Sequence, residues 1–300
     1  MELWPSLPPA PWEPTRATLH MWTQIVGKVR LALSPHQNHW WQVPLYVSAR
    51  GLTTSAIPYH GGNFEIEFDF VDHALVIRRS DGPAKTLALT PKSVAAFHAE
   101  VMAALRSLGI AVKIWTMPVE IPNPIAFEKD ETHASYAPEH ANRFWRALVS
   151  ADAVLKQFRG RFIGKCSPVH FFWGSFDLAV TRFSGRRAPS IPNADRITRE
   201  AYSHEVSSVG WWPGDAMIQA PAFYTYAAPQ PPGFADAAVR PAATKFNTQL
   251  SQFLLMYEDA RLSPSPRETV LDYCQSTYEA AANLAKWDRA ALERDAGRSG

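Results

Sequence analysis

The features that define disulfide-rich, membrane-spanning and nucleic-acid-binding proteins are scarce in this 300-residue chain. It has only two cysteines, so no disulfide framework holds the fold, and a reducing, cytoplasmic location is expected. No apolar run approaches the roughly 20 residues that cross a bilayer, and the first residues lack the pattern of a secretory signal. Neither sign of charge is in excess, because 30 Lys and Arg stand against 28 Asp and Glu. This balance argues against nucleic acid as a partner, as the lack of a span argues against a membrane.

Glycine is also scarce, with 15 residues against 25 prolines, whereas tryptophan is frequent, with 11 residues. Proline fixes the backbone and indicates many irregular connections, while tryptophan provides large rigid surfaces that must be buried or bind a ligand. Hydrophobic residues make up 46% of the chain and charged residues 19%, which excludes a disordered protein. A soluble chain with a large core is expected.

Hydrophobic periodicity predicts an α+β protein. Apolar residues three or four apart predict helices over residues 15–33, 91–108, 138–160 and 266–284. Runs of β-branched and aromatic residues between turn signals predict strands over residues 40–48, 53–57, 64–71, 75–79, 85–89, 112–119, 169–183, 204–212, 216–226 and 253–257.

The order of these elements predicts two similar halves, each an antiparallel sheet flanked by helices. We expect a proline-rich arm at 1–14, a first half at 15–125, a second half with long inserted loops at 126–290, and a polar tail at 291–300. Trp22 corresponds to Trp145, and the aromatic triplet at 39–41 to that at 170–172, which favours a pseudo-twofold duplication. The alternative is a chance repeat of a common order. If the halves pack as one unit, a cleft between them is the usual place for a ligand.

Three segments carry a resemblance to a known family. They are CSPVHFFWGSFD at 166–177 with its continuation to Arg186, LHMWTQIVGK at 19–28, and QSTYEAA at 275–281. Nearly the whole chain resembles an uncharacterised bacterial family, Domain of Unknown Function 5996. The resemblance implies no reaction, cofactor or site residue.

Two motifs resemble known sites but lack essential parts. The segment GRFIGKC at 160–166 is one residue shorter than a phosphate-binding loop, ends in cysteine and follows a helix instead of a strand, so we reject nucleotide binding. Cys166 and His170 suggest a thiol nucleophile with its base, but an extended chain would separate their Cα atoms by about 13 Å. A turn at Pro168 could bring them together; the alternative is a buried, inert cysteine.

Metal binding is left open by the sequence. Glu65, Glu67 and Asp69 share one face of a predicted strand, where they form either a cation site or, more simply, the solvated face of a sheet. Neither His36 with His39 nor His133 with His140 has the spacing or the further ligands of a zinc site.

Ionisable residues gather in the aromatic part of the second half. Alternation along a single strand over 169–183 places His170 and Asp177 on opposite faces, so these two cannot pair within it. Asp177 can instead approach a group on the next strand. The candidate acid–base or ligand groups are His170, Asp177, His204 and Glu205, and the candidate ligand-binding groups are Trp173, Arg182, Arg186 and Tyr202.

Three functions are compatible with this pattern. The leading hypothesis is an enzyme that acts on a small molecule in an aromatic-lined cleft, using histidine and carboxylate groups. The alternatives are a non-catalytic protein that binds a planar or apolar ligand, and a structural protein that binds a partner through the proline-rich segment 229–241. The sequence specifies no cofactor, substrate or oligomeric state.

Overall fold

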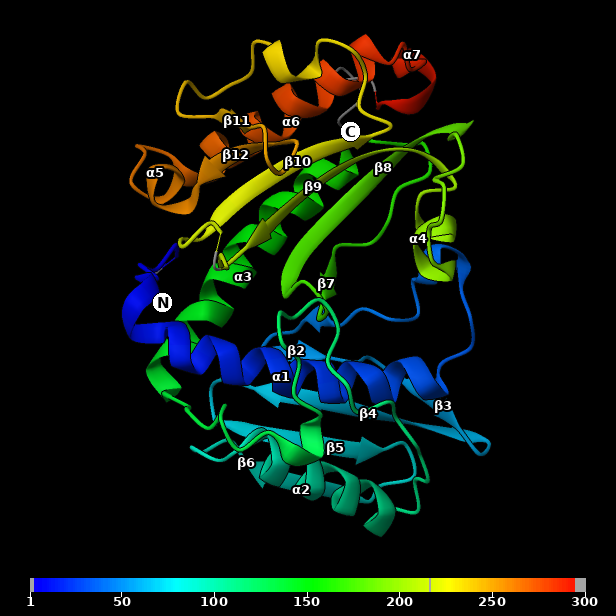
Figure 1. Cartoon of the computed structure of the whole chain (residues 1–300), viewed down its shortest axis with the longest axis vertical. Coiled ribbons are helices and arrows are strands. Elements are labelled where there is room, and N and C mark those ends of the chain that lie inside the picture. The colour runs from blue at the N-terminus through cyan, green and yellow to red at the C-terminus, as the bar shows by residue number, and fades with distance from the viewer. Residues whose placement is uncertain (1–2, 216, 295–300) are drawn as a thin grey trace.

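The computed structural model describes residues 3–215 and 217–294, and it has the α+β architecture expected, with two antiparallel six-stranded sheets (Figure 1). Seven helices and three short 3-10 turns lie within the described residues. The helices are α1 (Pro9–Leu33), α2 (Val94–Ser107), α3 (Pro138–Gly160), α4 (Arg196–Ala201), α5 (Tyr257–Arg261), α6 (Pro266–Leu284) and α7 (Arg289–Leu292). The 3-10 turns are Asn38–Trp40, Phe127–Lys129 and Phe234–Asp236.

The first sheet has the order β1-β2-β4-β5-β6, with β3 also paired to β4. Its strands are β1 (Tyr46–Val47), β2 (Gly51–Thr53), β3 (Ile57–Tyr59), β4 (Gly62–Asp69), β5 (Ala74–Arg79) and β6 (Ala84–Ala88). Along β4 the apolar side chains are buried beneath α1 and α2, and Phe68 stacks on Phe97 of α2. The alternate side chains face outward, as period-two alternation predicts.

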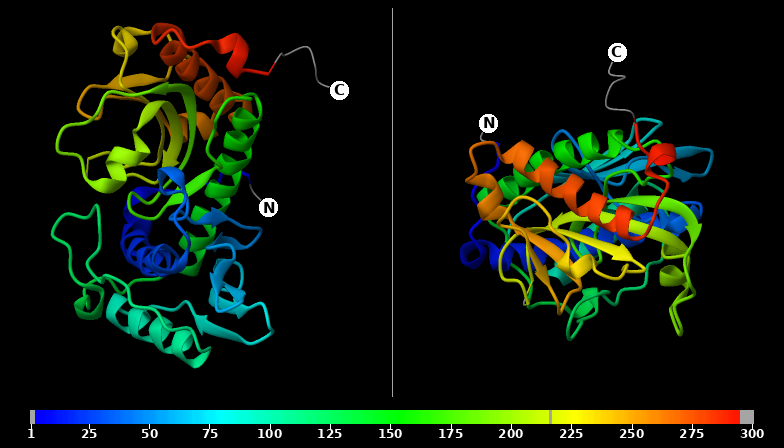
Figure 2. Two further views of the ribbon diagram at one scale, coloured as in Figure 1. Left: turned by 90° about the vertical axis from the view of Figure 1, so that its right-hand side faces the viewer. Right: turned by 90° about the horizontal axis from the view of Figure 1, so that it is seen from above.

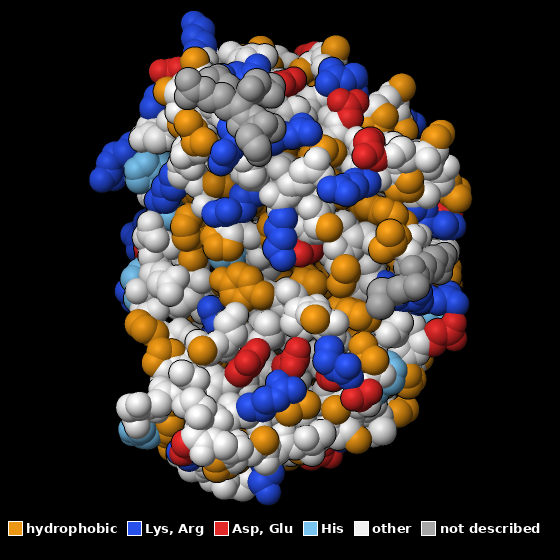
Figure 3. All heavy atoms as spheres, turned by 180° about the vertical axis from the view of Figure 1, so that it is seen from behind, with side chains coloured by type: hydrophobic (Ala, Val, Ile, Leu, Met, Phe, Trp, Pro, Cys, Tyr) orange, Lys and Arg blue, Asp and Glu red, His pale blue; other side chains and the backbone are white. Residues whose placement is uncertain are grey.

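The outward face of the first sheet is a network of ion pairs and hydrogen bonds. Arg78 binds Glu67 at 2.8 Å, Arg50 pairs with Asp69, and the hydroxyl of Thr53 donates to Glu65. Figure 3 shows acidic and basic side chains side by side on the lower half of the molecule, the half that holds this sheet. The three carboxylates considered as a cation site therefore already have protein partners.

The second sheet has the order β11-β12-β10-β9-β8-β7. Its strands are β7 (His170–Phe172), β8 (Asp177–Arg187), β9 (His204–Trp212), β10 (Ala222–Ala228), β11 (Lys245–Asn247) and β12 (Gln252–Met256). Helices α3 and α6 cover one face of this sheet (Figure 2). Helix α3 also contacts β1, so it crosses from one sheet to the other.

A short antiparallel bridge joins the two sheets. Leu45, next to β1, and Phe171 of β7 exchange two backbone hydrogen bonds of 2.9 Å. One continuous hydrophobic cluster extends from the first sheet through α1 and α3 to α6. Both sheets thus contribute to a single core.

Two departures from the local structure expected in the first half have a visible cause. Residues 9–14, expected in an extended arm, are helical, because Pro9 fits a first helical turn and Trp12 is buried against Phe144. The segment 112–119 is not a strand. Its backbone binds side chains of α1 instead: Gln24 bonds both the N–H and the C=O of Val119 at 2.9 Å.

Other boundaries move by a few residues. The second helix begins at Val94, capped by Ser93, rather than at residue 91. The strand predicted to start at residue 216, which itself lies outside the described residues, begins at Ala222. The predicted tail at 291–300 begins inside α7, and residues 295–300 lie outside the described part, as do residues 1 and 2 of the predicted arm.

The largest departure is a turn within the segment expected to be one strand, residues 169–183. The chain reverses between β7 and β8, and Phe176 takes a left-handed φ of 60°. The turn is held against α1, since the indole N–H of Trp173 donates to Val43 at 2.9 Å and its ring lies on Gly27. Glycine is required there because a Cβ would lie 2.3 Å from the Trp173 ring.

Substituting Gly27 by alanine is expected to lower the free energy of unfolding by about 1–3 kcal/mol, because the fixed indole cannot move away from a new methyl group. Urea unfolding measures the change. Gly160→Ala is the matched control, since nothing lies within 4 Å of a Cβ at that helical position. Equal stabilities of the two variants would contradict this account of the turn.

Candidate functional site on the outer face of the second sheet

The face of the second sheet turned away from α3 and α6, called here the outer face, carries polar groups among aromatic rings. Strand register places its side chains in neighbouring rows. They are His170, Phe172, Asp177, Ala179, Thr181, Ser208, Gly210, Trp212, Tyr224, Tyr226 and Leu254.

The turn between β7 and β8 brings His170 and Asp177 onto this same face. His170 pairs with Ala179, and Asp177 pairs with Phe172, so His170 and Asp177 are diagonal neighbours across the two strands. Such neighbours have Cα atoms about 7–8 Å apart. Alternation along one strand predicted that His170 and Asp177 lie on opposite faces. They lie on the same face, because the chain forms two strands, β7 and β8, with a turn between them.

Asp177 has the most unusual environment of the predicted residues. It is buried, and its carboxylate accepts a hydrogen bond from the hydroxyl of Tyr224. Burial raises the pKa of Asp177 to about 7, with a further increase from the negative charge of Glu120, while the Tyr224 bond acts in the opposite direction. A carboxyl group with this pKa can give or take a proton near neutral pH.

A row of tyrosines connects Asp177 to the predicted Tyr202. Tyr224 and Tyr226 stack with centroids 6.2 Å apart and planes at 11°. The hydroxyl of Tyr226 is 3.0 Å from that of Tyr202. Burial raises the pKa of Tyr202, Tyr224 and Tyr226, so all three keep their protons and can serve as hydrogen-bond donors.

His204 lies in a second group of ionisable residues. Its ring centroid is 6.0 Å from that of His39, and Lys165 donates to Nε2 of His39 at 2.5 Å. The other nitrogen of His39 donates to the backbone oxygen of Glu200 at 2.9 Å. Burial lowers the pKa of both His39 and Lys165.

Lys165 was not among the predicted site residues, and His39 was considered only as a metal ligand. The one structural signal at this place is backbone geometry: His39 and Trp40 are consecutive left-handed residues, with φ of 57° and 60°. Non-glycine residues adopt this conformation rarely, and often at functional positions.

Arg182 and Trp173 are packing residues. The Arg182 guanidinium lies 3.5 Å from the ring centroid of Phe158 and 4.3 Å from that of Tyr278, in the core beneath α3 and α6. Trp173 is buried against α1, as described above. Neither lies on the outer face.

Glu205 and Arg186 pair with each other. Their ion pair is 2.6 Å long, and Arg186 also donates to the carbonyl of Ala285 at the end of α6. Both therefore belong to the side of the sheet that α6 covers, away from Asp177. The structure thus brings together His170, Asp177 and Tyr202 from the predicted set, with His204 in the group beside His39.

Cys166 and His170 are held apart by an extended chain. Cys166 forms an isolated backbone bridge with Arg182 of β8, whereas His170 pairs with Ala179 of the same strand. Because Arg182 and Ala179 are three residues apart, Cys166 and His170 lie about 10 Å apart along β8. Burial raises the pKa of the Cys166 thiol to about 11 and that of the Cys274 thiol to about 12. Both observations favour inert cysteines over a thiol nucleophile.

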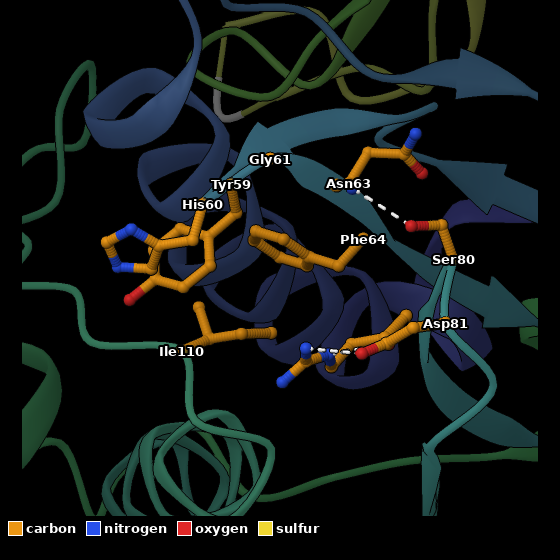
Figure 4. Close-up of a pocket in the computed structure, with 10 residues that line it drawn as sticks. Tyr59, His60, Gly61, Asn63, Phe64, Ser80, Asp81 and Ile110 are labelled. Atoms are coloured by element: carbon orange, nitrogen blue, oxygen red, sulfur yellow. Dashed lines mark hydrogen bonds and ion pairs between the residues drawn. The ribbon is translucent and has the colours of Figure 1, made fainter.

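Two hollows on the surface lie elsewhere. One, of about 250 Å³, is lined by Tyr59, His60 and Ile110 together with the Arg79–Asp81 segment (Figure 4). Arg79 binds the carboxylate of Asp81 and the carbonyl of Leu108. The hydroxyl of Ser80 accepts a hydrogen bond from the N–H of Asn63. The other hollow, of about 320 Å³, contains Arg240, whose guanidinium binds Asp272. These charges are already paired, so the hollows are weaker candidates than the outer face.

Comparison with protein-family models identifies the chain. A model described as a family of unknown function (DUF5996) matches residues 4–294. The chain belongs to this family. Comparison with curated proteins finds no match, and comparison with solved structures finds none either.

The described residues contain neither a metal-binding cluster nor a membrane-spanning helix. Within residues 3–215 and 217–294, no three or more His, Cys, Asp or Glu side chains are grouped so as to hold a metal ion. None of the helices in that part of the chain combines the length and the apolar character needed to cross a bilayer.

Asp177→Asn is expected to make the protein more stable than wild type above pH 7. Because the pKa of Asp177 is about 7 in the folded state and its ordinary value is 3.8, the folded state binds the proton more tightly, and wild type loses stability as pH rises from about 4 to 7. Asp177→Asn lacks this loss of stability. The difference in the free energy of unfolding between the variant and wild type should therefore grow by about 2–4 kcal/mol as the pH rises from about 4 to 7.

Urea unfolding from pH 4 to pH 8 measures this difference. The contribution of His170 to the pH dependence cancels, because both proteins contain that residue. Asp272→Asn is the matched control, because it removes one carboxylate at a partly exposed position, where it is paired with Arg240. A pH-independent difference between wild type and Asp177→Asn would show that Asp177 has no raised pKa.

Both thiols are expected to react with iodoacetamide more slowly than free cysteine at pH 8, since only the thiolate reacts and burial suppresses it. Mass spectrometry of the folded protein follows the reaction, and Cys274→Ser reports Cys166 alone. Urea-unfolded protein gives the reference rate. A Cys166 thiol as fast as that reference would revive the nucleophile hypothesis.

Proposed function

We propose that this protein is an enzyme that binds a small molecule against the outer face of the second sheet and uses Asp177 for proton transfer. The observation that carries the proposal is a buried carboxyl group whose pKa is close to 7, on a face lined by aromatic rings. General acids and bases work best when their pKa is near the working pH. Perturbed pKa values of this kind concentrate at functional sites.

The neighbours of Asp177 suit such a role. Tyr224 fixes the carboxyl group through its hydroxyl, as an orienting residue does. Phe172 and Trp212, both half-buried, offer flat apolar surfaces on which a ring or planar group can stack. The Tyr202 and Tyr226 hydroxyls bond each other at 3.0 Å, so one of the two keeps a proton that it can donate to an oxygen atom of a ligand.

His170 adds a second polar group next to Asp177. Burial and the charge of Arg30 lower its pKa to about 3, so the imidazole is neutral at pH 7 and presents one donor and one acceptor. A neutral imidazole beside a carboxyl group that titrates near pH 7 can hold a substrate while the carboxyl group exchanges the proton.

A screen of small molecules by thermal shift, followed by mass spectrometry of each stabilising compound, tests this function. Asp177→Asn should keep the binding and lower turnover by about 100- to 10,000-fold, and the wild-type rate should change with pH around 7. Asp272→Asn serves again as the control and should keep full activity.

Two results would count against an enzyme. Stabilising compounds that are never converted would indicate a binding protein for planar ligands instead. Turnover that survives in Asp177→Asn would move the chemistry to another residue.

A further inference from the structure

Arg30, near the end of α1, is a buried cation without a counter-charge. Only 7% of its surface is exposed, and its Nε and Nη1 atoms have no hydrogen-bond partner among the described residues. Its guanidinium lies 5.5 Å from the ring centroid of Tyr46. Within the described chain Arg30 forms no ion pair, and burial lowers its pKa. A buried charge of this kind is unfavourable unless something neutralises it.

His170 shares the neighbour Tyr46 with Arg30, lies within range of the Arg30 charge, and has two more polar atoms without a partner among the described residues. It is 1% exposed, and neither ring nitrogen has a hydrogen-bond partner among the described residues. Its ring lies 5.6 Å from that of Tyr46, so Tyr46 contacts both His170 and Arg30. Burial lowers the pKa of the imidazole, and the positive charges of Arg30 and Arg159 lower it further.

A second buried arginine shows what a purely structural site looks like. Arg182 is fully buried, but Phe158, Phe162 and Tyr278 surround its guanidinium, and it donates to the carbonyl of Phe158. The carboxylate of Glu293 also acts on it. Among the described residues the Arg30 guanidinium has one aromatic neighbour, Tyr46, which also forms a side-chain hydrogen bond with it, and burial keeps that phenol in its neutral form. The two environments therefore differ in what neutralises the charge.

We infer that Arg30 and His170 form a binding site for an oxyanion, the carboxylate or phosphate group of a small molecule. Arg30 offers two donor nitrogens, Nε and Nη1, and His170 a third, in surroundings where a charge-assisted hydrogen bond is strong. The rings of Trp41, Tyr46 and Phe172 contact the His170 ring, and each of these three residues is only half-buried. Figure 1 shows the later turns of α1 passing next to β7.

The position of this site suggests what the enzyme acts on. His170 is the diagonal neighbour of Asp177, so an oxyanion held by Arg30 and His170 places the rest of a small molecule along the outer face toward Asp177. The assignment of an anionic substrate rests on the proposed function, whereas the anion site itself rests only on its own contacts.

The test uses inorganic phosphate and acetate as probes of the wild-type protein. Ring ¹⁵N signals of labelled histidine are followed during titration, and His170→Gln identifies the His170 signals. We expect saturable shifts of His170 with at least one probe, and weakening of its affinity by about tenfold or more in Arg30→Met. Arg30→Lys keeps the positive charge, so its affinity for the probe should lie between those of wild type and Arg30→Met.

Arg106→Met is the matched control, because it removes one exposed positive charge from α2 without touching this site. It should bind the probes as wild type does. A response to phosphate alone identifies a phosphate site, and a response to acetate alone a carboxylate site. Absence of any His170 response in wild type, or equal affinity in Arg30→Met and Arg106→Met, would overturn the inference.

The two proposals fail separately. Loss of probe binding in Arg30→Met with turnover unaffected by Asp177→Asn would keep the anion site and reject the proposed chemistry. Turnover that needs Asp177 in a protein that binds neither probe would do the reverse.

Discussion

The turn between β7 and β8 determines the chemistry of the second sheet. Without it, His170 and Asp177 would lie on opposite faces of one long strand; with it, they are neighbours on the outer face. The turn depends on contacts far away in the sequence, since His20 donates to the carbonyl of Gly174 at 2.8 Å and Phe176 stacks on Phe144. The first helix of the chain therefore helps to build a site that belongs to the second sheet.

Elements with strong periodicity could be predicted from sequence. Helices α1, α3 and α6 and strand β4 each pack against the core on one side only. One-sided burial gives a periodic pattern of apolar residues, and this pattern is visible in the sequence. The segment 112–119 is apolar enough for a strand, but side chains of α1 satisfy part of its backbone, and no local pattern reveals that. The duplication of the two halves stays a prediction, as do the domain boundaries.

The candidate site was accessible to sequence reasoning in part. Asp177, Tyr202 and His170 were singled out because ionisable groups gather there among aromatic residues. Tyr224 was missed because its bond to Asp177 spans 47 positions, and Arg30 because its neighbours are set by the packing of α1. Arg182 shows the converse limit: it was predicted to bind a ligand, and its side chain lies in the core.

The bridge between Leu45 and Phe171 also affects how the molecule meets copies of itself. An outermost strand with free N–H and C=O groups can pair with a strand of another molecule and start aggregation. The bridge uses backbone groups of Phe171 in β7, the outermost strand of the second sheet, beside β1, the outermost strand of the first. The strands at the far ends, β6 and β11, carry Lys85 and Lys245, which are exposed and discourage such pairing. The bridge between the two sheets therefore leaves fewer free backbone groups at one edge of the second sheet for pairing with another molecule.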